Sequence, residues 1–231
     1  MNKGQDLDTA ILVFANSSEA ELQNKSIAQG AELFEALSRQ TLKVVAQSGL
    51  PYYLYTEKEQ EGATFSERFT HAIQEVFEKG YKRIITVGND SPHLRTEDLS
   101  FAHQQLLSEH TVLGPSADGG VYLMGIHKAD FDKTKFQSLP WQTSNLYTSL
   151  AHFLSRCKKV IRLRTLFDLD TFEDLRRFTA RFKDIGTRLL PLFIVLLRPK
   201  RSDDHHPVSS YALFLSTHFF NKGSPLSFMA V

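Results

Sequence analysis

The chain has 231 residues, of which 42% are hydrophobic and 23% charged, and its formal net charge is +1. This composition is typical of a globular protein, and the near-neutral charge gives no reason to expect nucleic acid or an acidic membrane as a partner. The single cysteine, Cys157, excludes an intramolecular disulfide. The polar start of the sequence does not resemble a signal peptide, and no apolar run approaches the roughly 20 residues of a membrane span, so we expect a cytoplasmic protein.

Short apolar segments alternate with longer amphipathic ones through the first 185 residues. We expect strands at residues 9–14, 51–56, 83–87, 111–113, 121–126 and 160–163, and helices at 27–47, 65–79, 96–107, 144–154 and 171–182. The polar stretch 16–19 bounds the first strand, and Thr96 is the expected N-cap of its helix. This alternation predicts an α/β fold of three layers, in which helices cover both faces of a mainly parallel central sheet.

The character of the sequence changes near Gly186. Residues 198–206 are charged and rich in histidine, and residues 211–231 mix Phe, Ser and Pro without a sustained period. We therefore expect one catalytic domain over residues 1–185 and a C-terminal tail over residues 186–231 that is not part of its core.

Two unusual loops follow predicted strands. Gly88-Asn89-Asp90-Ser91-Pro92 follows the strand at 83–87, and Gly114-Pro115-Ser116-Ala117-Asp118-Gly119-Gly120 follows the strand at 111–113. Ligands of parallel sheets bind beyond the carboxyl ends of the strands, so both loops are expected at one functional edge.

The first loop contains one acidic residue, Asp90. A carboxylate at this position can hold a hard divalent cation that neutralises a substrate diphosphate, and the small residues Gly88 and Ser91 leave room for a ligand. The sequence is equally compatible with Asp90 capping the turn or the next helix.

The second loop is harder to explain as a turn alone. Asp-Gly-Gly by itself is a common hairpin sequence, but three glycines, a proline and one acid between two strands favour a loop shaped around a ligand.

A third acidic segment is Asp168-Leu169-Asp170-Thr171. A capping box explains Thr171 and Asp174 but does not require Asp168 or Asp170. In an extended segment these two carboxylates point to opposite sides, so one of them can reach the ligand, and Asp170 is the preferred choice. Trp141, after Pro140, is compatible with a pocket wall or with simple packing.

Five motifs in this order resemble the DUF2064 family of small bacterial glycosyltransferase-A-like proteins. They are Ser66-Glu67-Arg68, Gly88-Asn89-Asp90-Ser91-Pro92, the stretch from Gly114 to Gly125 with Tyr122-Leu123, Pro140-Trp141-Gln142-Thr143, and Asp168-Leu169-Asp170-Thr171-Phe172-Glu173-Asp174-Leu175. The chain is more distantly similar to guanylyltransferases of cofactor metabolism.

The resemblance implies a Rossmann-like GT-A fold and a transferase that acts on a nucleotide-diphosphate sugar with Mg²⁺ or Mn²⁺. Asp90 and Asp118 would then be catalytic, Asp90 and Asp170 would bind the metal, and Lys25, Arg68, Gly88 and Asn89 would lie at the nucleotide and its phosphates. The expected acceptor is a small molecule, held by Gly114, Pro115, Ser116, Gly119, Gly120, Trp141 and Thr143.

The sequence departs from the family in its first loop. A basic Lys-Thr-Arg-Leu segment is usual there, whereas this chain has Asn24-Lys25-Ser26-Ile27, and lysine does not replace the bidentate phosphate contact of arginine. Two alternatives therefore stand beside the first reading: a nucleotidyltransferase that uses a nucleoside triphosphate, and a degenerate protein that binds without catalysis.

Overall fold

The computed structural model describes residues 8–24 and 31–169. Its six strands are β1 (Thr9–Phe14), β2 (Tyr52–Tyr55), β3 (Arg83–Val87), β4 (Thr111–Pro115), β5 (Val121–His127) and β6 (Val160–Arg162). They form one sheet in the order β2-β1-β3-β5-β4-β6. The pairs of β1 with β2, β1 with β3 and β4 with β6 are parallel, whereas β5 runs antiparallel to both β3 and β4. The expected mainly parallel sheet is confirmed.

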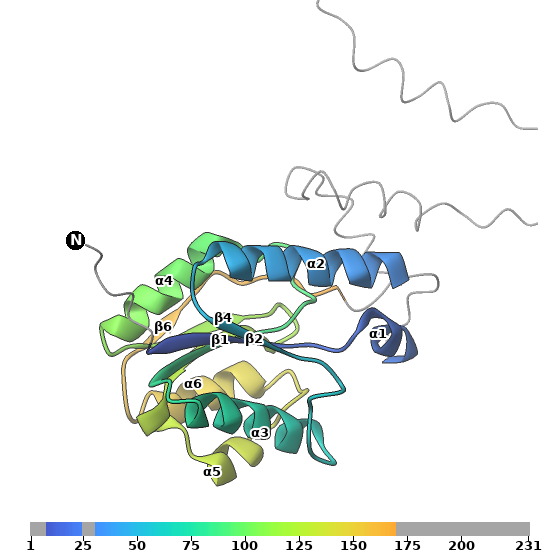
Figure 1. Cartoon of the computed structure of the whole chain (residues 1–231). Coiled ribbons are helices and arrows are strands. Elements are labelled where there is room, and N and C mark those ends of the chain that lie inside the picture. The colour runs from blue at the N-terminus through green and yellow to red at the C-terminus, as the bar shows by residue number, and fades with distance from the viewer. Residues whose placement is uncertain (1–7, 25–30, 170–231) are drawn as a thin grey trace, which may run out of the picture. The chain divides into compact units, whose positions relative to one another are not determined.

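Helices cover the sheet on both faces. They are α1 (Ser18–Asn24), α2 (Ala31–Gln47), α3 (Phe65–Glu78), α4 (Thr96–Leu107), α5 (Lys133–Gln137) and α6 (Leu146–Leu154), with a 3-10 turn η1 (Lys128–Asp130). In Figure 1, α2 and α4 lie on one side of the sheet, and α3, α5 and α6 lie on the other. The three-layer α/β architecture is therefore confirmed.

Strand β1 is buried on both faces, as its continuous apolar sequence predicts. Ala10 and Leu12 belong to the core cluster that includes Phe77 of α3, whereas Ile11 and Val13 belong to the cluster that includes Leu99 of α4. Full burial of each large aliphatic side chain contributes about 1.5–3 kcal/mol relative to its exposure.

Helix α3 begins with a complete capping box. The Thr64 side chain accepts a hydrogen bond from the backbone N–H of Glu67, and the Glu67 carboxylate accepts one from the backbone N–H of Thr64. Its buried face includes Phe69, Ile73 and Val76. The cap fixes where the helix starts and so places Phe65 and Phe69 in its first turns.

Two local expectations were wrong. The N-cap of α4 is Arg95, whose backbone N–H donates to Asp98, while Thr96 lies inside the helix and its hydroxyl donates to Val44. Strand β4 continues to Pro115 because its last residues still pair with β5 and with the segment around Leu166. The polar stretch 16–19 does bound β1, and helix α1, which was not expected, begins within it at Ser18.

Some expectations fall on residues outside the described ranges. These are the start of the helix at 27–30, the helix at 171–182 and the domain boundary at 185/186. Within residues 8–24 and 31–169, no helix is both long enough and apolar enough to span a membrane.

Candidate functional site

The two loops singled out in the sequence meet at one edge of the sheet. The first follows the carboxyl end of β3, and residues 116–120 join the end of β4 to the start of β5. A cavity of about 380 Å³ opens between them. It is lined by Phe14, Phe65, Phe69, Thr86, Val87, Gly88, Asp90, Ser116, Asp118, Gly120, Val121, Tyr122, Trp141, Gln142, Thr143, Leu146 and Asp168.

A third segment, residues 163–169, is hydrogen-bonded to both loops. The backbone N–H of Leu169 donates to the carbonyl oxygen of Asp90 at 3.0 Å, and the N–H of Ala117 donates to the carbonyl oxygen of Leu166 at 2.8 Å. We call residues 163–169 the connecting segment. Its hydrogen bonds fix the positions of both loops and bring Asp168 to the cavity.

Asp90 and Asp168 form the acidic end of the cavity. Ser91 donates a hydrogen bond from its hydroxyl to the carboxylate of Asp168. Burial and then the negative charge of Asp90 raise the pKa of Asp168 to about 7, although Ser116 and Ser91 act in the opposite direction. Asp90 and Asp168 thus line the same cavity, and the charge of Asp90 opposes ionisation of Asp168.

Asp118 lies in the tight turn between β4 and β5. One of its carboxylate oxygens accepts a hydrogen bond from the N–H of Gly120 at 2.9 Å, and the residue is exposed. Gly119 has φ +95, and a Cβ at this position would lie 2.0 Å from the carbonyl oxygen of Ser144. The requirement for glycine at 119 is therefore structural, because the turn packs directly against the backbone before α6.

Gly114 and Pro115 do not line the cavity. Both are buried in β4, and a Cβ on Gly114 would lie 2.5 Å from the ring of Tyr122. The structure thus gives Gly114 a packing role beneath Tyr122, where the sequence suggested a contact with substrate.

Aromatic rings line the same cavity as the acids, and we call Phe14, Phe65, Phe69 and Trp141 the aromatic wall. Phe14, Phe65 and Trp141 are half-buried, and Phe69 lies between them. Trp141 is 5.0 Å from Phe69 and 5.9 Å from Phe65 between ring centroids. The indole N–H of Trp141 donates to the carbonyl oxygen of Phe136 at 2.6 Å, so its polar edge is satisfied within the protein. Of these four aromatic residues, only Trp141 was singled out from the sequence.

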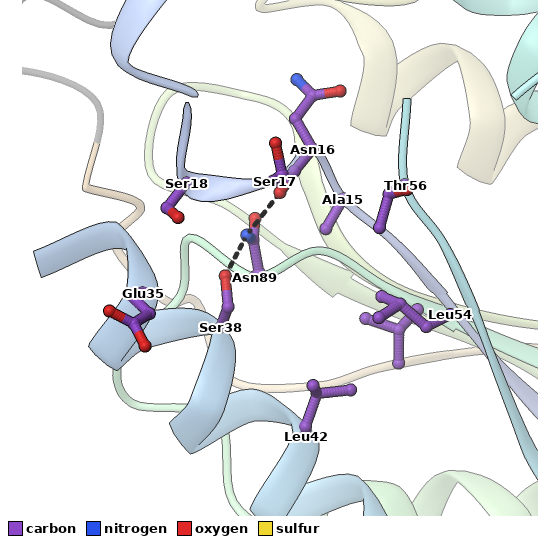
Figure 2. A pocket seen from close by; sticks show the side chains of 11 residues that line it. Ala15, Asn16, Ser17, Ser18, Glu35, Ser38, Leu42, Leu54, Thr56 and Asn89 are labelled. Atoms are coloured by element: carbon purple, nitrogen blue, oxygen red, sulfur yellow. Dashed lines mark hydrogen bonds between the residues drawn. The ribbon is translucent and has the colours of Figure 1, made fainter. Parts of the chain in front are cut away.

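Asn89 points away from this cavity into a second, smaller one of about 200 Å³. Its side-chain amide donates to Ser38 Oγ at 2.8 Å and to the carbonyl oxygen of Asn16 at 3.4 Å, as Figure 2 shows. Glu35 is the one charged residue among the described residues that line this pocket. Asn89 therefore ties the first loop to β1 and α2.

The predicted site residues separate into three groups. Gly88, Asp90, Ser116, Asp118, Gly120, Trp141 and Thr143 line one cavity together. Asn89, Gly114, Pro115, Gly119 and Arg68 do not line it, and the Arg68 guanidinium group donates to Gln60 and to the carbonyl oxygen of Ala63. Lys25 and Asp170 lie outside the described residues. Asp168, the other acid of the pair, lines the cavity.

Every charged side chain among the described residues that line this cavity is acidic: Asp90, Asp118 and Asp168. In residues 8–24 and 31–169, no group of three His, Cys, Asp or Glu side chains could hold a metal ion by itself. Mg²⁺ typically takes only one or two carboxylates and completes its shell with phosphate oxygens and water. The pair of Asp90 and Asp168 fits that pattern.

Known structures share this fold. A candidate nucleotide-diphospho-sugar transferase from Desulfovibrio desulfuricans G20 is 22% identical, with a TM-score of 0.71 over 83% of this chain and 97% of that chain. Rv0371c from Mycobacterium tuberculosis H37Rv is 14% identical, with a TM-score of 0.50 over 74% of this chain and 97% of that chain. At these identities the likeness establishes the fold.

None of the curated proteins matches the sequence. The model of one family, described as an uncharacterized protein conserved in bacteria, matches residues 21–143, which is more than half of the chain. That region contains both loops at the cavity and ends at Thr143 on its wall. The chain therefore belongs to the DUF2064 family.

Proposed function

We propose that this protein is a metal-dependent transferase that acts on a nucleotide-diphosphate sugar, with the cavity between Asp90, Asp118 and Asp168 as its active site. The observation that supports it most directly is the pair of carboxylates, Asp90 and Asp168, in a cavity whose charged described residues are all acidic. A diphosphate would be repelled there unless a cation lay between it and the acids. The likeness in fold to a candidate nucleotide-diphospho-sugar transferase agrees with this proposal.

Asp90 and Asp168 would hold Mg²⁺ or Mn²⁺, with the remaining positions filled by substrate and water. When bound, the cation would neutralise the charge that develops on the departing nucleoside diphosphate. Asp170 as a further ligand and Lys25 as a phosphate contact remain part of the proposal.

Asp118 would act as the general base. It is exposed at the cavity, and the N–H of Gly120 holds one of its oxygens. The acceptor hydroxyl oxygen would bond to the anomeric carbon of the donor sugar, while the bond from that carbon to the diphosphate oxygen breaks. The electron pair leaves with the nucleoside diphosphate, and the hydroxyl proton passes to Asp118.

Thermal unfolding with a panel of UDP-, GDP- and CDP-sugars tests the proposal. At least one of them is expected to raise the melting temperature of the wild-type protein when Mn²⁺ is present, and to lose this effect in Asp90→Asn and Asp168→Asn. Asp8→Asn is the matched control, because Asp8 pairs with Lys82 next to the strand ends opposite the cavity. No stabilisation by any sugar nucleotide, or equal stabilisation in all four proteins, would contradict the proposal.

Two further measurements separate the alternatives. Release of pyrophosphate from a nucleoside triphosphate would indicate nucleotidyl transfer. A cellular function that survives Asp90→Asn would indicate a binding protein without catalysis.

A further inference from the structure

We infer that the acceptor is an uncharged, hydroxyl-bearing ring that stacks on Phe65 and Trp141 of the aromatic wall. This inference rests on the proposed function and specifies its second substrate. It follows from the two kinds of side chain that line the cavity, aromatic rings and carboxylates.

The rings of the aromatic wall pack against one another and line the cavity. Phe65 and Phe69 stack at 5.7 Å, and each contacts Trp141. Phe14 packs edge-on against both phenylalanines, at 5.7 Å from Phe65 and 5.0 Å from Phe69. Because the rings already pack against one another, little side-chain entropy would be lost when a ligand stacks on them.

The three carboxylates of the cavity, Asp90, Asp118 and Asp168, limit which polar groups the ligand can carry. A divalent cation at Asp90 and Asp168 leaves Asp118 as a further carboxylate, and no cationic side chain occurs among the described residues of the lining. Carboxylates accept hydrogen bonds from hydroxyl groups, whereas they repel a phosphate or another carboxylate. The cavity therefore matches a neutral polyol ring, with an apolar face for the aromatic rings and hydroxyls for the acids.

A backbone hydrogen bond joins the turn that contains Asp118 to the segment that follows Trp141. The carbonyl oxygen of Gly119, next to Asp118, accepts a hydrogen bond from the N–H of Tyr147 at 3.0 Å, and the segment before Tyr147 contains Trp141 and Thr143. A ring on this wall would lie beside the carboxylate that removes its hydroxyl proton. An acceptor for nucleotidyl transfer, by contrast, is a phosphate monoester and would meet the carboxylate of Asp118 with two negative charges.

Trp141 is the one tryptophan in the chain, so its fluorescence reports directly on this wall. The probes are the methyl glycosides of glucose, galactose, mannose and N-acetylglucosamine, the corresponding 1-phosphates, and the nucleosides uridine, guanosine and cytidine, all without a divalent cation, so that no metal at Asp90 and Asp168 attracts the phosphate. At least one methyl glycoside is expected to change the fluorescence saturably, and its 1-phosphate to bind about tenfold more weakly or worse.

A substitution in the wall separates binding from packing. Phe65→Leu is expected to weaken glycoside binding roughly threefold to tenfold, which is the usual contribution of an aromatic contact, at a similar melting temperature. Phe131→Leu is the control, because Phe131 packs on Phe77 and Phe136 outside this cavity. If Phe65→Leu does not fold, Trp141→Phe followed by calorimetry replaces it.

The inference is overturned if a 1-phosphate binds as tightly as its glycoside, if only nucleosides bind, or if the wall variants leave glycoside affinity unchanged. It is also overturned if no glycoside binds while sugar nucleotides stabilise the protein with Mn²⁺. Glycoside binding without any sugar-nucleotide binding would instead contradict the proposed function but would still support a glycoside site on the aromatic wall.

Discussion

The backbone N–H of Leu169 donates a hydrogen bond to the carbonyl oxygen of Asp90 at 3.0 Å. This contact joins two acidic motifs that lie far apart in the sequence. Leu169 is fully buried, while its neighbour Asp168 faces the cavity beside Asp90. The burial of Leu169 and its hydrogen bond to Asp90 therefore hold Asp168 at the cavity beside Asp90.

Ser91→Ala is expected to destabilise the protein more at high pH than at low pH. The Ser91 hydroxyl donates to the Asp168 carboxylate, and burial raises the pKa of Asp168 to about 7. Below that pH the carboxyl is mainly protonated, whereas above it the charged form loses a hydrogen bond with a contribution of about 1.5–3 kcal/mol. Urea unfolding at about pH 5 and about pH 9 measures the difference.

Ser108→Ala is the control for this experiment, because the Ser108 hydroxyl donates to the carbonyl oxygen of Gln104 on the surface of α4. Its effect should be small at both pH values. An equal loss of stability in Ser91→Ala at low and high pH would contradict the assigned contact with a carboxylate.

Gly119→Ala is expected to cost considerably more stability than Gly80→Ala. Both glycines have positive φ, +95 and +102, but a Cβ at 119 would lie 2.0 Å from Ser144 O, whereas one at 80 meets nothing within 4 Å. The conformational penalty alone is about 1 kcal/mol and is common to both variants. Chemical denaturation gives the comparison, and similar losses in the two variants would show that the turn does not pack on Ser144 as described.

His127 is expected to make stability decrease as the pH falls below about 6.5. Burial and then the positive charge of Lys158 lower the pKa of His127, while Glu109, His110 and Asp130 act in the opposite direction. The unfolded chain then takes up a proton at a higher pH than the folded chain does. Since the unfolded state binds more protons in this window, acidification favours unfolding, and stability is retained above it.

His127→Gln should flatten the pH dependence of stability between about pH 5 and about pH 7. His152→Gln is the control, because His152 is exposed on α6. Thermal unfolding across this range in the three proteins is the measurement. If His127→Gln keeps the slope of the wild-type protein, another group is responsible.

Much of the fold could be predicted because the apolar strands are short and clearly bounded. Residues 83–87 have the same bounds in the sequence prediction and in β3. The direction of β5 was not anticipated from the alternation of strands and helices. It follows from the tight turn at 116–120, since a short connection between neighbouring strands makes them antiparallel.

The candidate site could be predicted only in part, because side-chain direction depends on packing between distant segments. Ligands of parallel sheets bind beyond the carboxyl ends of the strands, and this rule placed the loops with Asp90 and Asp118 at one edge of the sheet. Both residues line the cavity. The alternation of Asp168 and Asp170 indicated that one acid can reach the ligand, and Asp170 was preferred; Asp168 lines the cavity, and Asp170 lies outside the described residues. Phe65 and Phe69 have the spacing of a buried helix face, which does not distinguish a core from a cavity wall.

Arg164→Lys is expected to loosen the connecting segment without unfolding the domain. The Arg164 guanidinium donates to both carboxylate oxygens of Asp98, at 3.2 and 2.7 Å, and to the carbonyl oxygen of His93 at 2.7 Å. Lysine cannot make this planar set of contacts. Because Arg164 is partly exposed, the expected loss of global stability is only about 1 kcal/mol.

Arg164→Lys should change amide exchange in the connecting segment more than it changes the global free energy of unfolding. With the start of the connecting segment released from α4, the amides of Leu166 and Leu169 should exchange with solvent faster, because their bonds to Pro115 and Asp90 open more often. Arg162→Lys is the matched control, since the Arg162 side chain contacts Thr165 and the ring of Tyr147 instead. Hydrogen exchange followed by mass spectrometry reads these amides directly. Equal protection in the two variants would mean that Arg164 does not anchor the segment that carries Asp168 to Asp90.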